Sequence, residues 1–204
     1  MTIVLIIIIS LVSVASFSNP TLMHQLMHYP YLEHKEKQYY RLFTGGLVHA
    51  DWFHLGINMF VLYNFGELIE SIFAEMLPVS IAKLAYLGLF VFCVIVGNVP
   101  SFLREQHNQN YSGVGASGAT SGIVFTFILF YPFQIIYIYV LPVPGLLFAV
   151  LYLAYSSYAA KQQRDNIGHD AHFAGAIGGI LYTLAVIPST LSLFIDQISN
   201  YFGR

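Results

Sequence analysis

Two short segments of this sequence combine a serine and a histidine with glycines, residue types that could carry out nucleophilic catalysis. Residues 115–118 read Gly-Ala-Ser-Gly. A serine at a helix N-terminus lies among unpaired backbone N–H groups that can hold a developing oxyanion. Residues 171–175 read Ala-His-Phe-Ala-Gly, and a neutral histidine within hydrogen-bond reach of a serine can take its proton. The candidate nucleophile is Ser117 and the candidate general base is His172.

A third pair, His54 and Asn58, is spaced four residues apart. This spacing places both side chains on one face of a helix. Both side chains can donate hydrogen bonds, as an oxyanion hole requires. The simpler interpretation is that the pair joins neighbouring helices by hydrogen bonds.

Helix packing is also the simpler explanation for each of the other segments taken alone. Gly118 and Gly122 form one small-residue motif, and Gly175 and Gly179 form another. Both glycines of the second motif share a helical face with His172. If that face packs on the helix beginning near Ser117, the two candidate catalytic residues meet at one depth.

The composition places these residues in a membrane. Of the 204 residues, 57% are hydrophobic and 9% are charged, against about 25% charged residues in an average soluble domain. This excludes an ordinary cytosolic protein and a disordered chain. The net charge of −2 gives no basic surface for nucleic acid. The one cysteine excludes an intramolecular disulfide, and we expect no metal or cofactor.

Six apolar segments are candidate spans, so we expect an all-α membrane protein with one domain over residues 1–204. The segments are 3–17, 53–73, 79–99, 115–133, 145–160 and 171–187. The first of them has the length of a signal-peptide core, which is an alternative interpretation. Residues 18–51 form a long first loop with an interfacial pattern, and residues 189–204 form a short C-terminal tail.

The three polar groups share one side of this predicted bundle. The second, fourth and sixth spans run in the same direction, and each polar group lies near the start of its span. Asp170 lies two residues from His172, a spacing that does not share a helix face. The sequence therefore predicts a catalytic dyad rather than a triad.

Taken in order along the chain, these motifs resemble the rhomboid family of intramembrane serine proteases. The matching motifs are His54-x-x-x-Asn58, Gly66-x-x-x-Glu70, Gly115-Ala116-Ser117-Gly118 and Ala171-His172-x-x-Gly175-x-x-x-Gly179. The resemblance implies a six-helix bundle of rhomboid type, with Ser117 as nucleophile and His172 as general base. It implies an oxyanion hole made by His54, Asn58 and the Ser117 backbone N–H.

The resemblance also implies supporting roles and substrates. Gly115, Gly118, Gly175, Gly179 and Glu70 would support the site, and Glu70 could brace the first loop through Arg41 or backbone donors. The substrates would be transmembrane helices that enter laterally past the fifth helix. The other partner would be membrane lipid, and nucleic acid would not be one. The sequence leaves the oligomeric state open, and a bacterial plasma membrane is the simplest location.

Some features depart from the family pattern. Many members carry an aromatic residue four positions after the nucleophile, stacked on the catalytic histidine, where this chain has Ser121. The orientation of His172 must then come from elsewhere. The frequent Trp-Arg pair of the first loop is Tyr40-Arg41 here. His169 is a rival general base, three residues before His172.

The distribution of Lys and Arg conflicts with the cytoplasmic termini that the resemblance implies. The side of the termini would carry Lys83 and Arg204. The other side would carry Lys35, Lys37, Arg41, Arg104, Lys161 and Arg164. We follow the resemblance, because a folded first loop can retain its own cations.

Three other functions are consistent with a polar cluster in a membrane. One is a small transporter or channel that uses His54, Asn58 and His172 as a polar path. Another is a noncatalytic rhomboid-like protein that binds transmembrane helices. A metal enzyme using His54, His169 and His172 is the third, although the sequence lacks an H-E-x-x-H motif.

Overall fold

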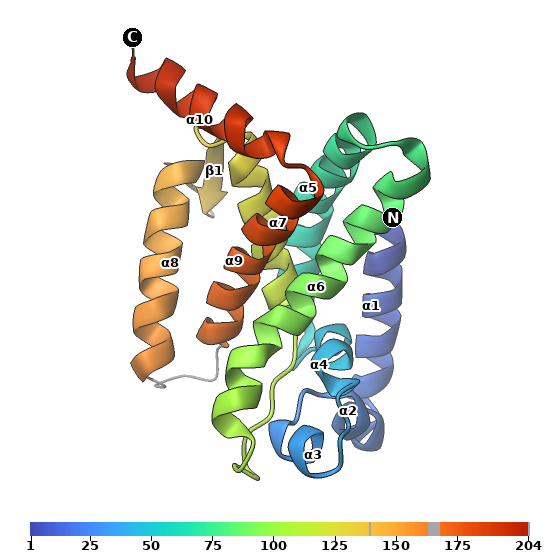
Figure 1. The fold of residues 1–204 in the computed structure, drawn as a ribbon. Coiled ribbons are helices and arrows are strands. Elements are labelled where there is room, and N and C mark those ends of the chain that lie inside the picture. The colour runs from blue at the N-terminus through green and yellow to red at the C-terminus, as the bar shows by residue number, and fades with distance from the viewer. Residues whose placement is uncertain (139, 163–167, 204) are drawn as a thin grey trace.

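The computed structural model describes residues 1–138, 140–162 and 168–203, which form a bundle of helices with one small hairpin (Figure 1). The bundle helices are α1 (Thr2–Phe17), α5 (Trp52–Met76), α6 (Val79–Glu105), α7 (Ser117–Phe130), α8 (Gly145–Gln162) and α9 (His169–Val186). Both ends of the chain lie at one end of the bundle, and the first loop lies at the other (Figure 1). Helices α5, α7 and α9 all run away from the first loop, as predicted.

The helices coincide with the six predicted segments, but length does not decide how many cross the membrane. Among the described residues, α6 alone is a single helix long and apolar enough to span. Helix α9 meets the same criteria only together with α10 (Ser189–Phe202), across a bend of 111°. Helices α1 and α7 are apolar but shorter. An α-helical membrane fold fits this arrangement, and six spans stay a prediction.

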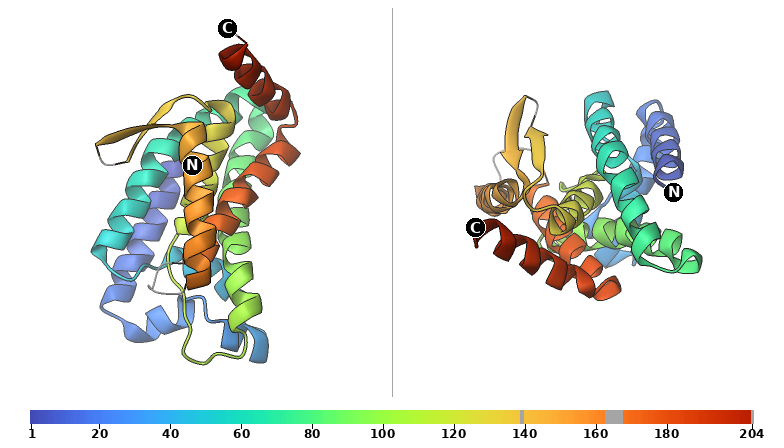
Figure 2. Two further views of the ribbon diagram at one scale, coloured as in Figure 1. Left: turned by 90° about the vertical axis from the view of Figure 1, so that its left-hand side faces the viewer. Right: turned by 90° about the horizontal axis from the view of Figure 1, so that it is seen from above.

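Helix α7 is the centre of the bundle (Figure 2). Every residue from Gly118 to Phe130 is buried. Because α7 has 14 residues, it rises only about 21 Å, while the hydrocarbon core is about 30 Å thick. The helical part of this segment therefore covers only about two thirds of the hydrocarbon thickness. Its first residue, Ser117, is therefore able to lie below the surface rather than at it.

Helix α6 continues further than the sequence predicts. The predicted span ends at Val99, directly before Pro100, a residue that lacks the backbone N–H of a helical hydrogen bond. In the structure the helix passes through Pro100 and ends at Glu105. The predicted end at Val99 is therefore wrong, and Ser101 belongs to the last turns of α6.

The first loop is structured, as its length and pattern predict. It contains α2 (Pro20–Leu26), α3 (Pro30–Lys35), α4 (Arg41–Thr44) and the 3-10 turn η1 (Gly45–Leu47). Proline begins both α2 and α3, where its missing N–H has no helical acceptor to lose. Arg41 is 2% exposed, and its guanidinium donates hydrogen bonds to His24 O, Met27 O and Gln38 Oε1.

The end of the bundle opposite the first loop carries a hairpin that the sequence does not predict. Strands β1 (Ile135–Ile138) and β2 (Leu141–Pro144) pair antiparallel, with Ile136 opposite Val143 (Figure 2). At the same end of the bundle, α10 forms the predicted helix of the tail, and the Gln197 side chain donates a hydrogen bond to Phe130 O at the end of α7. The sequence also predicts a short charged turn over residues 161–170. The middle of this turn, with Arg164, lies outside the described residues, and so does Arg204.

Candidate active site

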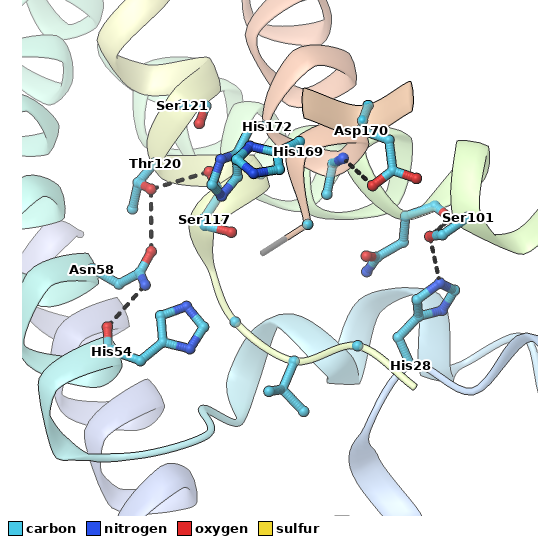
Figure 3. A pocket seen from close by; sticks show the side chains of 18 of the residues that line it. His28, His54, Asn58, Ser101, Ser117, Thr120, Ser121, His169, Asp170 and His172 are labelled. Atoms are coloured by element: carbon cyan, nitrogen blue, oxygen red, sulfur yellow. Dashed lines mark hydrogen bonds between the residues drawn. The ribbon is translucent and has the colours of Figure 1, made fainter. Parts of the chain in front are cut away.

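One cavity brings the predicted site residues together. It has a volume of about 1190 Å³ and is lined by residues from the first turns of α5, α7 and α9. His54, Asn58, Ser117 and His172 all line it (Figure 3). Ser117 and His172 are both partly exposed within it. Residues from three helices, up to 118 positions apart in the sequence, thus line one cavity.

Ser117 begins α7 directly after a tight backbone turn. Gly115 has φ +121°, a conformation that residues with a Cβ rarely adopt. A Cβ at Gly115 would also lie 2.6 Å from Cε1 of His54. Glycine therefore allows the turn and lets the His54 ring approach the backbone just before Ser117. Because Ser117 is the first helical residue, its backbone N–H has no partner within the helix.

Glycines bring the first turn of α9 against α7. A Cβ on Gly175 would overlap the carbonyl group of Gly118, and one on Gly179 would overlap that of Gly122. Without side chains at these positions the two backbones touch. The contact joins Gly118, next to Ser117, to the helix face that carries His172. The Gly-x-x-x-Gly spacing in α9 lies where the sequence predicts it, on the side facing α7.

The ring of Tyr152, on α8, stacks on His172. The two ring centroids are 6.2 Å apart and the planes are inclined by 24°. The Tyr152 hydroxyl lies 2.6 Å from the Ser121 hydroxyl, one turn after Ser117 on α7. Ser121 is thus hydrogen-bonded to Tyr152, the aromatic residue that stacks on His172.

His169 and Asp170 occupy the first turn of α9 beside His172. His169 is 5% exposed, and its ring meets that of His172 edge to face at 6.0 Å. The Asp170 carboxylate accepts a hydrogen bond from Ala171 N and forms an ion pair with Arg104 on α6 at 2.8 Å. Asp170 is therefore used in joining α6 to α9.

Asn58 connects α5 to α7. Its side-chain amide donates to His54 O over 2.9 Å and accepts from the Thr120 hydroxyl over 3.2 Å (Figure 3). An amide NH2 group has two hydrogens, and the bond to His54 uses one of them. Asn58 is 3% exposed. Asp51 caps the N-terminus of α5, because its carboxylate accepts a hydrogen bond from His54 N at 2.7 Å.

The first loop holds the segment that precedes Ser117 at three successive places. His28 and Gly113 exchange backbone hydrogen bonds of 3.0 and 2.9 Å. Gly115 N donates to Gly45 O over 2.9 Å. Ala116 N donates to Nε2 of His49 over 3.2 Å. The residues just before the serine are therefore paired with the first loop rather than with water.

His49 is held in one neutral tautomer. Its Nε2 accepts from Ala116 N, so the ring hydrogen is on Nδ1, which lies 2.9 Å from the Ser13 hydroxyl. That hydroxyl donates in turn to Leu47 O over 3.0 Å. Burial, and after it the neighbouring His54, lowers the pKa of His49 to about 3. Its ring meets the His54 ring edge to face at 5.0 Å.

A second buried serine–histidine–carboxylate group joins the first loop to α6. His28 Nδ1 lies 2.7 Å from the Glu33 carboxylate, and its Nε2 lies 2.8 Å from the Ser101 hydroxyl. All three side chains are at most 1% exposed. The Ser101 hydroxyl also lies 3.0 Å from Asn98 O, within the same helix. This group therefore secures the loop to α6.

Glu70 supports a different part of the fold from the one the sequence suggests. Its carboxylate accepts hydrogen bonds from Thr2 N over 2.7 Å and from the amino group of Met1. These bonds lie at the start of α1. The alternative that Glu70 braces the first loop with Arg41 is wrong, because the Arg41 guanidinium is bound within the loop itself. Gly66 belongs to the same region, since a Cβ there would lie 2.5 Å from the Tyr86 hydroxyl.

Three residues of the site have no role in the sequence analysis: His49, Thr120 and Tyr152. Each acts through a contact between elements that are far apart in the sequence. For Tyr152 there was one indirect indication in the sequence: with Ser121 in place of the usual aromatic residue, His172 needs another partner to orient it. Among the described residues, no three His, Cys, Asp or Glu side chains are grouped as a metal site requires, so His54, His169 and His172 do not form one.

Comparison with known proteins finds members of the rhomboid family. Residues 36–189 match the Rhomboid domain family. RHOMBOID-like protein 12, mitochondrial, of Arabidopsis thaliana is 28% identical over 152 residues, which are 70% of this chain and 45% of that protein. Rhomboid protein 1, mitochondrial, of Saccharomyces cerevisiae is 27% identical over 139 residues, which are 66% of this chain and 38% of that protein.

A bacterial relative matches over more of its length. YdcA of Bacillus subtilis, provisionally described as a rhomboid protease, is 28% identical over 154 residues, which are 74% of this chain and 68% of that protein. By contrast, the chain spans less than half the length of the two mitochondrial relatives. Because the family match covers more than half of the sequence, this chain belongs to the membrane-embedded rhomboid family.

Proposed function

We propose that this protein is an intramembrane serine endopeptidase that cuts transmembrane helices with a Ser117–His172 dyad. One observation carries the proposal. The backbone contact between Gly118 and Gly175 brings the first turns of α7 and α9 together, so Ser117 and His172 line one cavity. A serine at a helix N-terminus with a histidine on the adjoining helix is the arrangement that acyl transfer needs.

In the acylation step, the Ser117 hydroxyl oxygen attacks the carbonyl carbon of the scissile peptide. His172 takes the hydroxyl proton as the new C–O bond forms. The C–N bond then breaks, and His172 returns that proton to the leaving amine. In the second half, His172 takes a proton from water as the water oxygen bonds to the acyl carbon. The ester C–O bond to Ser117 then breaks, and His172 returns that proton to the Ser117 oxygen.

Three donors would stabilise the oxyanion that forms in both halves. The Ser117 backbone N–H has no helical acceptor, and Asn58 lines the same cavity with a second amide hydrogen beyond the one it donates to His54. The His54 ring lies against Gly115, at the turn that leads to Ser117. We assign it as the third donor.

Hydrolysis needs water, and the cavity lining supports its presence. Asn98, Arg104, Asn108 and Asp170 line the cavity together with the dyad. These polar and charged side chains form a route along which water can reach a site below the bilayer surface. Because Asp170 is paired with Arg104, we assign catalysis to a dyad and keep His169 as a neighbour that contacts the base.

The proposal includes six spans with both termini in the cytoplasm of a bacterial-type cell, in its plasma membrane. The first loop then lies on the outer side. Cysteine variants at Lys35 and Lys37, both exposed, test this orientation. A membrane-impermeant maleimide should label them in intact cells. Labelling only after the cells are permeabilised would contradict the orientation.

Reconstitution in vesicles tests the activity. The wild type and the Ser117→Ala variant are each reconstituted with a panel of single-span reporter proteins, and fragments are identified by mass spectrometry. We expect cleavage within or beside the reporter's transmembrane segment by the wild type alone. Reporter binding without cleavage would favour a helix-binding protein. Solute flux that survives Ser117→Ala would favour a transporter.

A further inference from the structure

Tyr152 lies on a third helix and contacts both helices that carry the dyad. It belongs to α8, its ring stacks on His172 of α9, and its hydroxyl is hydrogen-bonded to Ser121 of α7 at 2.6 Å. Ser121 lies one helical turn after Ser117. Tyr152 is therefore placed at the level of both catalytic residues, in contact with one of them and with the helix of the other.

The neighbours of Tyr152 hold its ring in this place. Phe125 and Phe148 lie against it with ring centroids at 5.5 and 5.3 Å. His172 in turn has Tyr152 on its face and the edge-to-face ring of His169 at 6.0 Å. Aromatic contacts of this kind stabilise an arrangement by about 0.5–1.5 kcal/mol beyond the burial of area. The imidazole plane is therefore set by rings from two helices.

Few residues of helix α8 are buried. Among its 18 residues only Gly145 and Ser156 are buried, and Gly145 is the first of them. An element with few buried contacts separates from its neighbours at a low free-energy cost. The contacts of Tyr152 with Ser121, Phe125 and His172 hold the middle of α8 against α7 and α9, together with the ring pairs Phe148–Phe125 and Tyr155–His169.

We propose that Tyr152 is a positioning residue that orients the His172 imidazole, and that it does so only while α8 is packed against α7. This inference rests on the proposed function. Proton transfer from Ser117 requires an aligned imidazole, and a misplacement of 1 Å can cost about 10²-fold in rate. Movement of α8 away from the bundle would remove the ring from His172 and lower the reactivity of the dyad.

The test is the labelling rate of the full-length protein with a small fluorophosphonate, which reports the reactivity of Ser117 without a transmembrane substrate. We expect Tyr152→Leu to slow labelling by about tenfold to 100-fold. Tyr152→Phe retains the stacked ring and should restore labelling to within about threefold of the wild type, an effect comparable to one neutral hydrogen bond. Tyr158→Leu is the matched control, because Tyr158 lies on the same helix and is 62% exposed.

The hydrogen bond to Ser121 is tested by a double-mutant cycle. Ser121→Ala and Tyr152→Phe remove the same bond from opposite ends, so the double variant should be no slower than either single variant. Additive effects would contradict the role of this bond. Thermal unfolding of each variant in detergent shows whether it is folded.

Each outcome for the labelling rate decides between the explanations. If the wild type is labelled and a folded Tyr152→Leu variant is labelled equally fast or faster, the ring does not position His172 and the inference is overturned. If Tyr152→Phe is as slow as Tyr152→Leu, stacking is not the cause, and the inference is likewise overturned. If the folded wild type is not labelled at all, the proposed function itself fails.

Discussion

Ala116, the residue before the candidate nucleophile, donates its backbone N–H to Nε2 of His49 over 3.2 Å. His49 is fully buried and belongs to the first loop. The loop therefore helps to build the site, since it supplies the acceptor for a backbone group one residue from Ser117. The bonds from His28 and Gly45 to the same segment extend this contact.

The stability of the protein should depend on the protonation of His49. The pKa of His49 is lowered to about 3, from an ordinary value of about 6.5. Protonation would place a hydrogen on Nε2, against the N–H of Ala116. The unfolded chain therefore binds the proton more tightly than the folded one. The stabilising contribution of neutral His49 is complete above about pH 6.5 and is lost as the pH falls towards 3.

A variant of His49 checks this pH dependence. We expect His49→Ala to be less stable than the wild type at pH 7.5 by about 1–3 kcal/mol, since it leaves Ala116 N–H buried without its acceptor. Its free energy of unfolding should fall less steeply between pH 6.5 and 5. The control is His24→Ala, which removes an exposed histidine of the same loop. Equal pH profiles for the wild type and His49→Ala would contradict this role.

The contact between α7 and α9 should not tolerate a methyl group. In Gly175→Ala the new Cβ would meet the carbonyl of Gly118, so the helices must move apart. Overpacking of this kind costs about 1–3 kcal/mol, and a shift of 1 Å between the dyad residues can cost about 10²-fold in rate. Gly56→Ala is the control, since a Cβ there meets nothing within 4 Å. Full activity in Gly175→Ala would refute the close approach.

Asn58 should contribute to the rate as an oxyanion donor. We expect Asn58→Ala to lower kcat by about 10²–10³-fold while Ser117 and His172 keep their positions. Thr120→Val separates this effect from a structural one, because it removes the hydroxyl that bonds the Asn58 oxygen but retains the amide. A loss in Thr120→Val as large as in Asn58→Ala would show that Asn58 acts by joining α5 to α7.

The sequence was sufficient to predict the helices and the direction in which they run. Hydrophobic length and glycine spacing are local properties, so the positions of α5, α7 and α9 and the face of α9 that carries Gly175 follow from them. The extension of α6 past Pro100 could not be predicted, because neighbouring segments decide whether a proline ends a helix. The β1–β2 hairpin was missed for a similar reason, since Pro142 and Pro144 in β2 are residues that disfavour a strand.

The candidate site was predictable only where a spacing within one helix reveals it. His54 and Asn58 share a helix face, and Ser117 and His172 follow from their glycine-containing segments. The contacts that orient them are tertiary. Nothing in the spacing of Tyr152 relates it to Ser121 or His172, and nothing in that of His49 relates it to Ala116. These pairs are 31, 20 and 67 residues apart in the chain.

The central claim is that His172 activates Ser117, and labelling by a fluorophosphonate tests it most directly. The purified wild type, Ser117→Ala, His172→Ala and His169→Ala are treated side by side in detergent, and the modified residue is identified by mass spectrometry. The account predicts labelling at Ser117 in the wild type and in His169→Ala, and none in the other two variants. No labelling of a folded wild type, or labelling that persists in His172→Ala but is lost in His169→Ala, would contradict it.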